Sequence, residues 1–256
     1  MLIAMLLQVQ KTCHNRNQKN RGNQQAMHIP DGFINAPVSL GAGILAAGTV
    51  AVALKQARGK LDNQVAPMAG LAAVFIFAVQ MLNFPIVAGT SGHLLGGALA
   101  AILIGRWPGL LALTVVLSLQ ALIFADGGLS ALGLNLVNMG VITVLGGWFI
   151  FRGMTKVMPK SHLGVVIASG LAAFMTVPLS ALGFVVQYAL GGTGIFETAS
   201  VLTAMVGVHV LIGIGEGIIT ALTVSAVLAT RPDLVYGARE LLPKANLTIK
   251  NVEVQS

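Results

Sequence analysis

Long apolar runs separated by short polar loops dominate the chain from residue 27 onward. Seven of these runs are long enough for a membrane-spanning helix, which needs about 20 mostly apolar residues. None alternates apolar and polar positions as the strands of a membrane barrel do. The pattern predicts an all-α integral membrane protein, a compact bundle of about seven transmembrane helices. The predicted spans are 38–57, 65–82, 87–105, 108–125, 131–151, 162–190 and 200–229.

The sixth run, 162–190, is too long for one straight span. It contains Pro178, which cannot donate a backbone hydrogen bond inside a helix. We therefore expect a kink or an interfacial end in this run.

Basic residues alternate between the loops. Cytoplasmic loops of membrane proteins are enriched in Lys and Arg, and here these residues follow only the odd-numbered runs. The loops after the second, fourth and sixth runs contain neither type, and they carry Asp126 and Glu197 instead. This arrangement predicts a multi-pass protein of the cell membrane (inner or plasma membrane), with residue 27 outside and the C-terminus in the cytoplasm. The basic residues are Lys55, Arg58, Lys60, Arg106, Arg152, Lys156, Lys160, Arg231, Arg239, Lys244 and Lys250.

Composition supports the membrane assignment. The chain is 55% hydrophobic and only 9% charged, and its mean hydropathy is +0.85; soluble domains have about 25% charged residues. One cysteine and this hydropathy exclude a disulfide-rich secreted scaffold, a disordered chain and a nucleic-acid-binding domain. The net charge of +7 is therefore attributed to membrane topology rather than to a nucleic-acid partner.

Residues 1–26 do not fit this topology, because they place basic residues on the predicted outer side. A removable leader, a genuine polar tail and a misassigned start are the three explanations, and we favour a start at Met27. The stretch before Met27 is a poor signal peptide, since its basic residues follow its short apolar segment. The predicted organisation is a leader or misassigned start (1–26), a seven-helix metal-binding domain (27–230) and a cytoplasmic tail (231–256).

Several polar residues are predicted to share the outer half of the bilayer. Ionisable groups in hydrocarbon are costly unless they are paired or solvated, so each is a candidate functional residue. An isolated intramembrane His is more often a hydrogen-bonding partner between helices than a metal ligand. The depth of each residue within its run places the following near one outward-facing cavity: His28, His93 (about two turns into the third run), Gln120, Asn135, Asn138 and His209.

The sequence Met-His-Ile-Pro-Asp-Gly at residues 27–32 points to a metal. If Met27 is the N-terminus, its α-amine, the amide nitrogen of His28 and the His28 imidazole form fused five- and six-membered chelate rings around one ion. His93 can supply a fourth nitrogen from the packed helices. Four nitrogens in a plane suit Ni(II) or Cu(II), with Co(II) also conceivable. Affinity should fall as the pH drops, because the amine and the amide must lose protons.

Two acidic residues are expected to have structural roles. Asp31 precedes Gly32 and is expected to cap a turn there. Glu216 lies two helical turns after His209, on the same face of the seventh run, among glycines that permit close helix approach. An interhelical hydrogen bond is the preferred role of Glu216.

Four sequence motifs resemble the CbiM/NikM family, the substrate-binding membrane components of energy-coupling-factor (ECF) nickel and cobalt transporters. The similarity extends from Met27 to about residue 230. It implies a seven-helix protein with its N-terminal segment threaded into the bundle, and a site made of the Met27 amine, the His28 amide and imidazole, and the His93 imidazole. The motifs are MHIPDGF (27–33), GTSGHLLGG (89–97), ADGGLSALGLNLVNMG (125–140) and IGEG (214–217).

The resemblance also implies partners. These are a transmembrane coupling (T) subunit, a pair of cytoplasmic ATP-binding-cassette ATPases and a small accessory membrane protein. Membrane lipid surrounds the chain itself. The chain has no phosphate-binding loop of the GxxxxGK[ST] type, so it is not expected to be an enzyme that hydrolyses ATP by that route. The wording of the first two motifs is closer to the nickel branch, with cobalt uptake for cobalamin synthesis as the alternative.

Two rival interpretations use other residues. Ser91, within Gly-Thr-Ser-Gly, and His209 are similar to the dyad of rhomboid-type intramembrane serine proteases, although no oxyanion-hole residues accompany them. A proton relay through Asp126, Glu216 and the histidines would indicate a coupled carrier. Neither interpretation uses the Met-His start of the domain.

Overall fold

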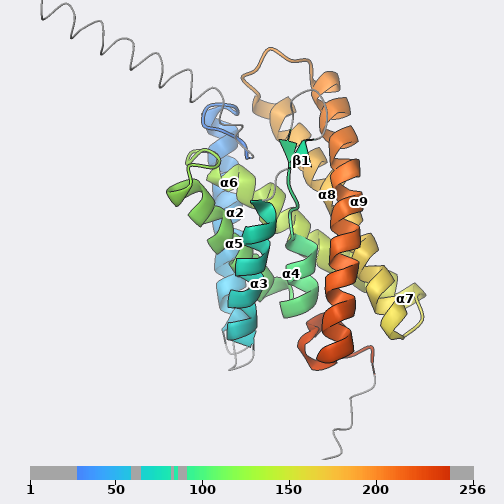
Figure 1. Cartoon of the computed structure of the whole chain (residues 1–256). Helices are drawn as coiled ribbons and strands as arrows, with labels where there is room; N and C mark the ends of the chain where they lie inside the picture. Colours follow the sequence, from blue (N-terminus) through green and yellow to red (C-terminus); the bar gives the residue numbers. More distant parts are fainter. Residues whose placement is uncertain (1–27, 59–64, 82–83, 86–90, 243–256) are drawn as a thin grey trace, which may run out of the picture.

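Helices account for nearly all of the described structure (Figure 1). The computed structural model describes residues 28–58, 65–81, 84–85 and 91–242. A π-helix, η1, joins α6 to α7, and two short antiparallel strands precede α4. The elements are α2 Ala36–Ala57, α3 Val65–Gln80, β1 Phe84–Pro85, β2 Ser91–Gly92, α4 Gly97–Ile104, α5 Arg106–Ile123, α6 Leu132–Asn135, η1 Leu136–Gly146, α7 Gly147–Val157, α8 His162–Gly191, α9 Thr198–Thr230, η2 Pro232–Leu234 and η3 Tyr236–Ala238.

Five helical segments have the length and composition needed to cross a membrane: Ala36–Ala57, Arg106–Ile123, Leu132–Val157, His162–Gly191 and Thr198–Thr230. They correspond to five of the seven predicted runs, and α3 corresponds to a sixth. The multi-pass, all-α prediction is confirmed. The sixth run forms one continuous helix, α8, that includes Pro178. Helix α8 begins after Ser161, whose side chain accepts a hydrogen bond from the Gly164 amide.

The prediction of a helix over 87–105 is wrong. Of the described residues in this run, 91–105, only Gly97–Ile104 are helical, and residues 93–96 are non-helical. Gly96 has a φ of +76°, a left-handed conformation that interrupts a right-handed helix. His93 therefore lies in an irregular segment before α4 and not two turns inside a helix.

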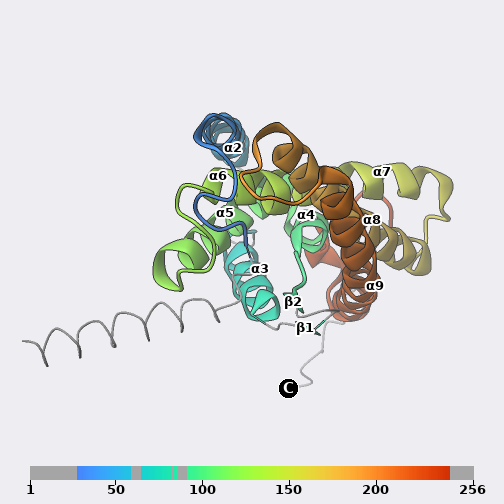
Figure 2. The ribbon, with the colours of Figure 1, turned by 90° about the horizontal axis from the view of Figure 1, so that it is seen from above.

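Helix α4 is the centre of the bundle (Figure 2). All eight of its residues are buried, and they are small or aliphatic. The outer helices differ, because α2 exposes large apolar residues such as Leu40 and Ile44, which are 67% and 66% exposed. In a membrane such a surface faces lipid, and all backbone groups must be bonded within the protein.

The two ends of the bundle carry different loops. In Figure 1 the ends of α2, α7 and α9 lie at the bottom, whereas the segment before α2 and the loops 124–131 and 192–197 lie at the top. Basic residues stand at these three helix ends: Lys55 and Arg58 at the end of α2, Lys156 at the end of α7 and Arg231 at the end of α9. The region after α9 begins with a docked turn, because Gly237 and Ala238 of η3 are buried. The predicted leader, 1–26, and residues 243–256 lie outside the described residues.

We predict that Gly96→Ala destabilises the bundle. The left-handed conformation costs a residue with a side chain about 1–2 kcal/mol, and a Cβ atom here would lie 2.9 Å from Cγ2 of the buried Ile76. Thermal unfolding of the detergent-solubilised protein should show a lower Tm. Gly48→Ala is the control, because Gly48 lies in α2 and a Cβ atom added there would have nothing within 4 Å. Equal Tm values for the two variants would contradict the prediction.

Candidate metal centre

Hydrogen bonds to α6, to the end of α8 and to the loop after α8 hold the segment that precedes α2 at the top of the bundle. The Asn135 side chain accepts a hydrogen bond from the Ile29 amide (3.1 Å) and donates one to the Ile29 carbonyl (3.3 Å). The backbone N–H of Asn35 donates a hydrogen bond to the Gly191 carbonyl, and the backbone N–H of Thr193 donates one to the Phe33 carbonyl. A non-helical backbone is thereby satisfied by side chains and loops of the bundle.

Asp31 is part of this attachment. Its Oδ1 accepts hydrogen bonds from the amide (2.7 Å) and the hydroxyl (2.6 Å) of Ser130. These bonds lower the pKa of the Asp31 carboxyl below its ordinary value, since they stabilise the charged form. Asp31 thus connects two distant loops, whereas the sequence predicted only a cap for the local turn at Gly32.

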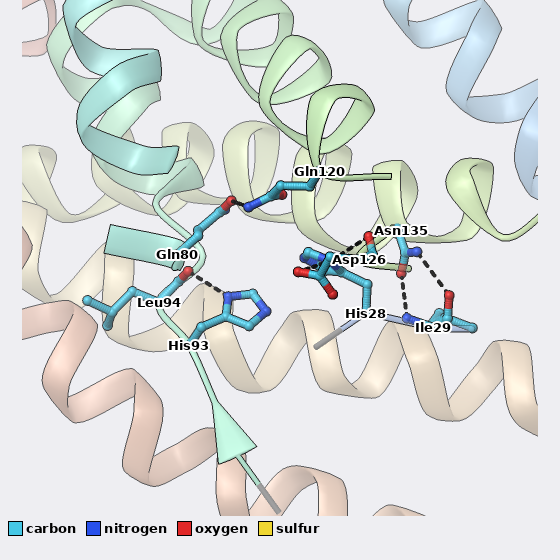
Figure 3. Close-up of polar contacts among 8 residues, drawn as sticks. All are labelled: His28, Ile29, Gln80, His93, Leu94, Gln120, Asp126 and Asn135. Atoms are coloured by element: carbon cyan, nitrogen blue, oxygen red, sulfur yellow. Dashed lines mark hydrogen bonds and ion pairs between the residues drawn. The ribbon is translucent and has the colours of Figure 1, made fainter. Parts of the chain in front are cut away.

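His28 is the first described residue and is buried, with 6% of its surface exposed. Its Nδ1 hydrogen-bonds the backbone carbonyl of Asp126 at 3.2 Å and lies 3.2 Å from Asp126 Oδ2 (Figure 3). Its Nε2 is buried and has no hydrogen-bond partner among the described residues. A buried polar atom without a partner is costly, so this orientation of the ring leaves one nitrogen unsatisfied.

His93 is held by the polar contacts of its own segment. Its Nδ1 lies 2.9 Å from the Leu94 carbonyl, which leaves Nε2 available (Figure 3). Gln80 donates to the Leu95 carbonyl (2.7 Å), and Gln120 donates in turn to Gln80 Oε1 (3.0 Å). These bonds fix a non-helical backbone inside the bundle and with it the position of His93.

Glu216 bonds the same segment from the opposite side. Its two carboxylate oxygens accept hydrogen bonds from the backbone N–H groups of Leu95 (2.5 Å) and Gly96 (2.9 Å). Glu216 is 2% exposed and lies on α9. The expected interhelical hydrogen bond is therefore a clamp between α9 and the segment carrying His93.

The two histidines meet although they are 65 positions apart. Their ring centroids are 5.1 Å apart, and the ring planes are inclined at 69° to each other. Among the described residues, no group of three His, Cys, Asp or Glu side chains could hold one ion. An ion bound between His28 and His93 therefore needs other donors, and the residue immediately before His28 is Met27, which lies outside the described residues.

A cavity of about 310 Å³ adjoins both histidines. Its walls are mostly apolar, with a few polar side chains. His209 is one of these, and its Nδ1 lies 2.7 Å from the Met205 carbonyl on its own helix. The lining residues are His28, Ile29, Pro30, Phe33, His93, Leu95, Asn135, Asn138, Met139, Ser180, Ala181, Phe184, Ala204, Met205, Val208, His209 and Ile212.

The other predicted polar residues have packing roles. Asn138 exchanges two hydrogen bonds with Gln187, of 2.8 and 3.0 Å, and its carbonyl accepts the Ser180 hydroxyl. Gln120 bonds Gln80 rather than either histidine. The structure thus brings together His28, His93, Asn135 and, across the cavity, His209.

The rival interpretations use residues that the structure describes only in part. The side chain of Ser91 lies outside the described part of the chain, so its placement relative to His209 is not described. Asp126 contacts His28, whereas Glu216 contacts backbone amides. The two acids of the supposed relay are therefore engaged separately.

Sequence reasoning missed two residues of the site. Gln80 lies at the end of α3, and its role depends on a backbone carbonyl 15 positions away. Asp126 was considered for a relay and not as a partner of His28. The motif ADGG offered a signal, since a carboxylate between turn-forming residues is suited to a loop that approaches another segment.

Residues 28–234 match the CbiM family, described as the cobalt uptake substrate-specific transmembrane region. The chain belongs to this family. It is 40% identical to a Haloquadratum walsbyi protein named for metal transport, over 82% of this chain and 94% of that one. An Archaeoglobus fulgidus protein named for fused nickel transport is 36% identical, over 82% of this chain and 68% of the relative. A crystal structure titled a truncated transition metal transporter matches with a TM-score of 0.72 and 29% identity, over 79% of this chain and 99% of that one.

We predict that Glu216→Ala destabilises this CbiM-family chain more than Glu216→Gln does. Alanine leaves the buried Leu95 and Gly96 amides without acceptors, at a cost of about 1–3 kcal/mol each, whereas glutamine retains one acceptor oxygen. Thermal unfolding measures the order. Glu197→Gln, at the exposed start of α9, is the control for loss of an acidic group. If Glu216→Ala unfolds at the wild-type temperature, the clamp is not stabilising.

Proposed function

We propose that this chain is the substrate-binding membrane component of an ATP-driven ECF-type importer of Ni²⁺ or Co²⁺. The ion is bound by four nitrogens: the α-amine of Met27, the amide and imidazole of His28, and Nε2 of His93. The observation that carries the proposal is the meeting of two buried imidazoles, whose ring centroids are 5.1 Å apart. One of them belongs to His28, the residue that follows Met27.

The donor chemistry supports a transition metal. Neutral imidazole nitrogens bind nickel and cobalt well, and a planar set of four nitrogens favours Ni(II) over Co(II). The nickel name of the Archaeoglobus fulgidus relative agrees with this preference, while the family description specifies cobalt. Ni²⁺ is our preferred substrate, and cobalt uptake for cobalamin synthesis is the alternative.

The four-nitrogen site requires a free amine at Met27. In the proposal, residues 1–26 are either not translated or removed, because a peptide nitrogen at Met27 would not be a basic donor. In the proposed orientation, the end of the bundle that contains the candidate metal centre faces the outside, and the end with the basic loops faces the cytoplasm. This orientation follows the distribution of Lys and Arg.

In this proposal, ATP hydrolysis by partner subunits drives transport. A coupling subunit, two ATP-binding-cassette ATPases and a small accessory membrane protein complete the importer. This chain itself is a transport subunit rather than an enzyme, since it lacks the phosphate-binding loop and its polar cluster is organised around two imidazoles.

The test combines N-terminal sequencing of the membrane-extracted protein with metal analysis and titration with Ni²⁺. We expect a chain that begins at Met27 and binds about one ion, as a single four-nitrogen site requires. His28→Ala and His93→Ala should each abolish high-affinity binding, whereas His162→Ala, at the exposed start of α8, should not. A chain that retains residues 1–26 and holds no metal would refute the proposed site.

Binding should also depend on pH. An amine and an amide give up protons when they bind the ion, so protonation competes with the metal. The α-amine has an ordinary pKa of about 8, and we expect the affinity for Ni²⁺ to fall at least about tenfold per pH unit below pH 7. Titration calorimetry in two buffers of different ionisation enthalpy measures the protons released. A pH-independent affinity would contradict coordination by the amine and the amide.

A further inference from the structure

We propose that Asp126 is a positioning residue for the metal site: it holds His28 Nδ1 in the orientation observed and His28 Nε2 after a half-turn of the ring. The inference rests on the proposed function, because it concerns how the same site captures its ion. It adds a residue and a conformational step that the chelate chemistry alone does not specify.

The chelate requires one particular nitrogen of the ring. The amide nitrogen of His28 and its Nδ1 are separated by Cα, Cβ and Cγ, so together with the ion they close a six-membered ring. Nε2 lies on the far side of the imidazole and cannot reach an ion held by the same residue's amide nitrogen. Nδ1 must therefore face the ion without its proton.

The structure shows the opposite orientation. Nδ1 lies 3.2 Å from the Asp126 carbonyl, and a carbonyl can only accept, so this nitrogen carries the proton. Asp126 Oδ2 lies at the same distance. In a neutral ring with its proton on Nδ1, the other nitrogen, Nε2, is the acceptor. Nε2 is buried and has no hydrogen-bond partner among the described residues. In this orientation Nδ1, the nitrogen that the chelate needs, faces Asp126 (Figure 3).

A half-turn about the Cβ–Cγ bond converts one state into the other. It exchanges Nδ1 with Cδ2 and Nε2 with Cε1, and Cε1 adjoins Nδ1 on the edge that faces Asp126. After the turn, Nε2 lies on that edge and donates to the Asp126 carboxylate, while Nδ1 faces the ion. One proton leaves Nδ1 and one is taken up at Nε2 through water, so the ring stays neutral. A carboxylate that accepts from the second nitrogen is the usual support of a metal-bound His.

The loop around Asp126 is built to present this carboxylate. Ala125 and Gly127 on either side have φ values of +53° and +90°, and Ala125 is the only non-glycine residue with positive φ in the described segments. A Cβ atom on Gly127 would lie 2.8 Å from Cβ of His28. The Asp126 amide donates to the Gln120 carbonyl at 3.0 Å, which ties the loop to α5. A left-handed alanine is unfavourable and persists where the surrounding contacts require it.

Three variants test the role of the carboxylate in the chain that begins at Met27, with nickel chloride as the probe. Asp126→Ala should weaken Ni²⁺ binding by about 10–100-fold, the usual effect of removing such a partner. Asp126→Asn should recover most of the affinity, because its amide oxygen still accepts from Nε2–H. Glu197→Gln, an exposed acid on the same end of the bundle, should bind as the wild type does.

Nitrogen-15 NMR of histidine-labelled wild-type protein tests the half-turn independently of the variants. The metal-free His28 should carry its proton on Nδ1, and the nickel-bound His28 should carry it on Nε2. A nickel-bound His28 that keeps its proton on Nδ1 would overturn the proposal. So would wild-type affinity in Asp126→Ala together with loss of binding in His28→Ala, a result that leaves the proposed function intact. Binding unaffected by His28→Ala would instead refute the proposed function.

Discussion

Every backbone group inside a membrane bundle must be bonded within the protein, and this constraint organises the site. Two non-helical segments enter the bundle, 28–35 and 93–96, and each carries one histidine. Asn135 bonds both backbone groups of Ile29 in the first segment. Glu216 bonds the amides of the second segment. Without these side chains the irregular segments would leave unpaired polar groups in an apolar interior.

The buried polar residues consequently divide into two kinds. Gln80, Gln120, Asn138 and Glu216 satisfy backbone groups or one another, and they hold the scaffold in one arrangement. The imidazoles of His28 and His93 each use Nδ1 in a local hydrogen bond, and Nε2 of His28 has no hydrogen-bond partner among the described residues. A polar network that is satisfied elsewhere can thus hold two imidazoles close together in the candidate metal centre.

This division explains why helices outside the candidate metal centre affect its geometry. Helix α9 contacts the His93 segment through Glu216, and α5 contacts the His28 loop through the Gln120 carbonyl. A shift of either helix would move one histidine relative to the other. Hydrogen bonds therefore connect membrane-spanning helices α9 and α5 to the candidate metal centre.

The sequence by itself determined the membrane class, six of the seven helical regions, the alternation of basic loops and the two histidines, because hydropathy and loop charge are local properties summed along the chain. The family motifs identified the chain's family for the same reason. The tertiary structure decided that residues 93–96 are non-helical, that Gln80 supports them, and that Asp126 holds His28. Those features depend on hydrogen bonds between positions far apart in sequence, such as Glu216 with Leu95. An apolar run has the same hydropathy whether it is helical or extended, so only the packed bundle decides which partner satisfies its backbone.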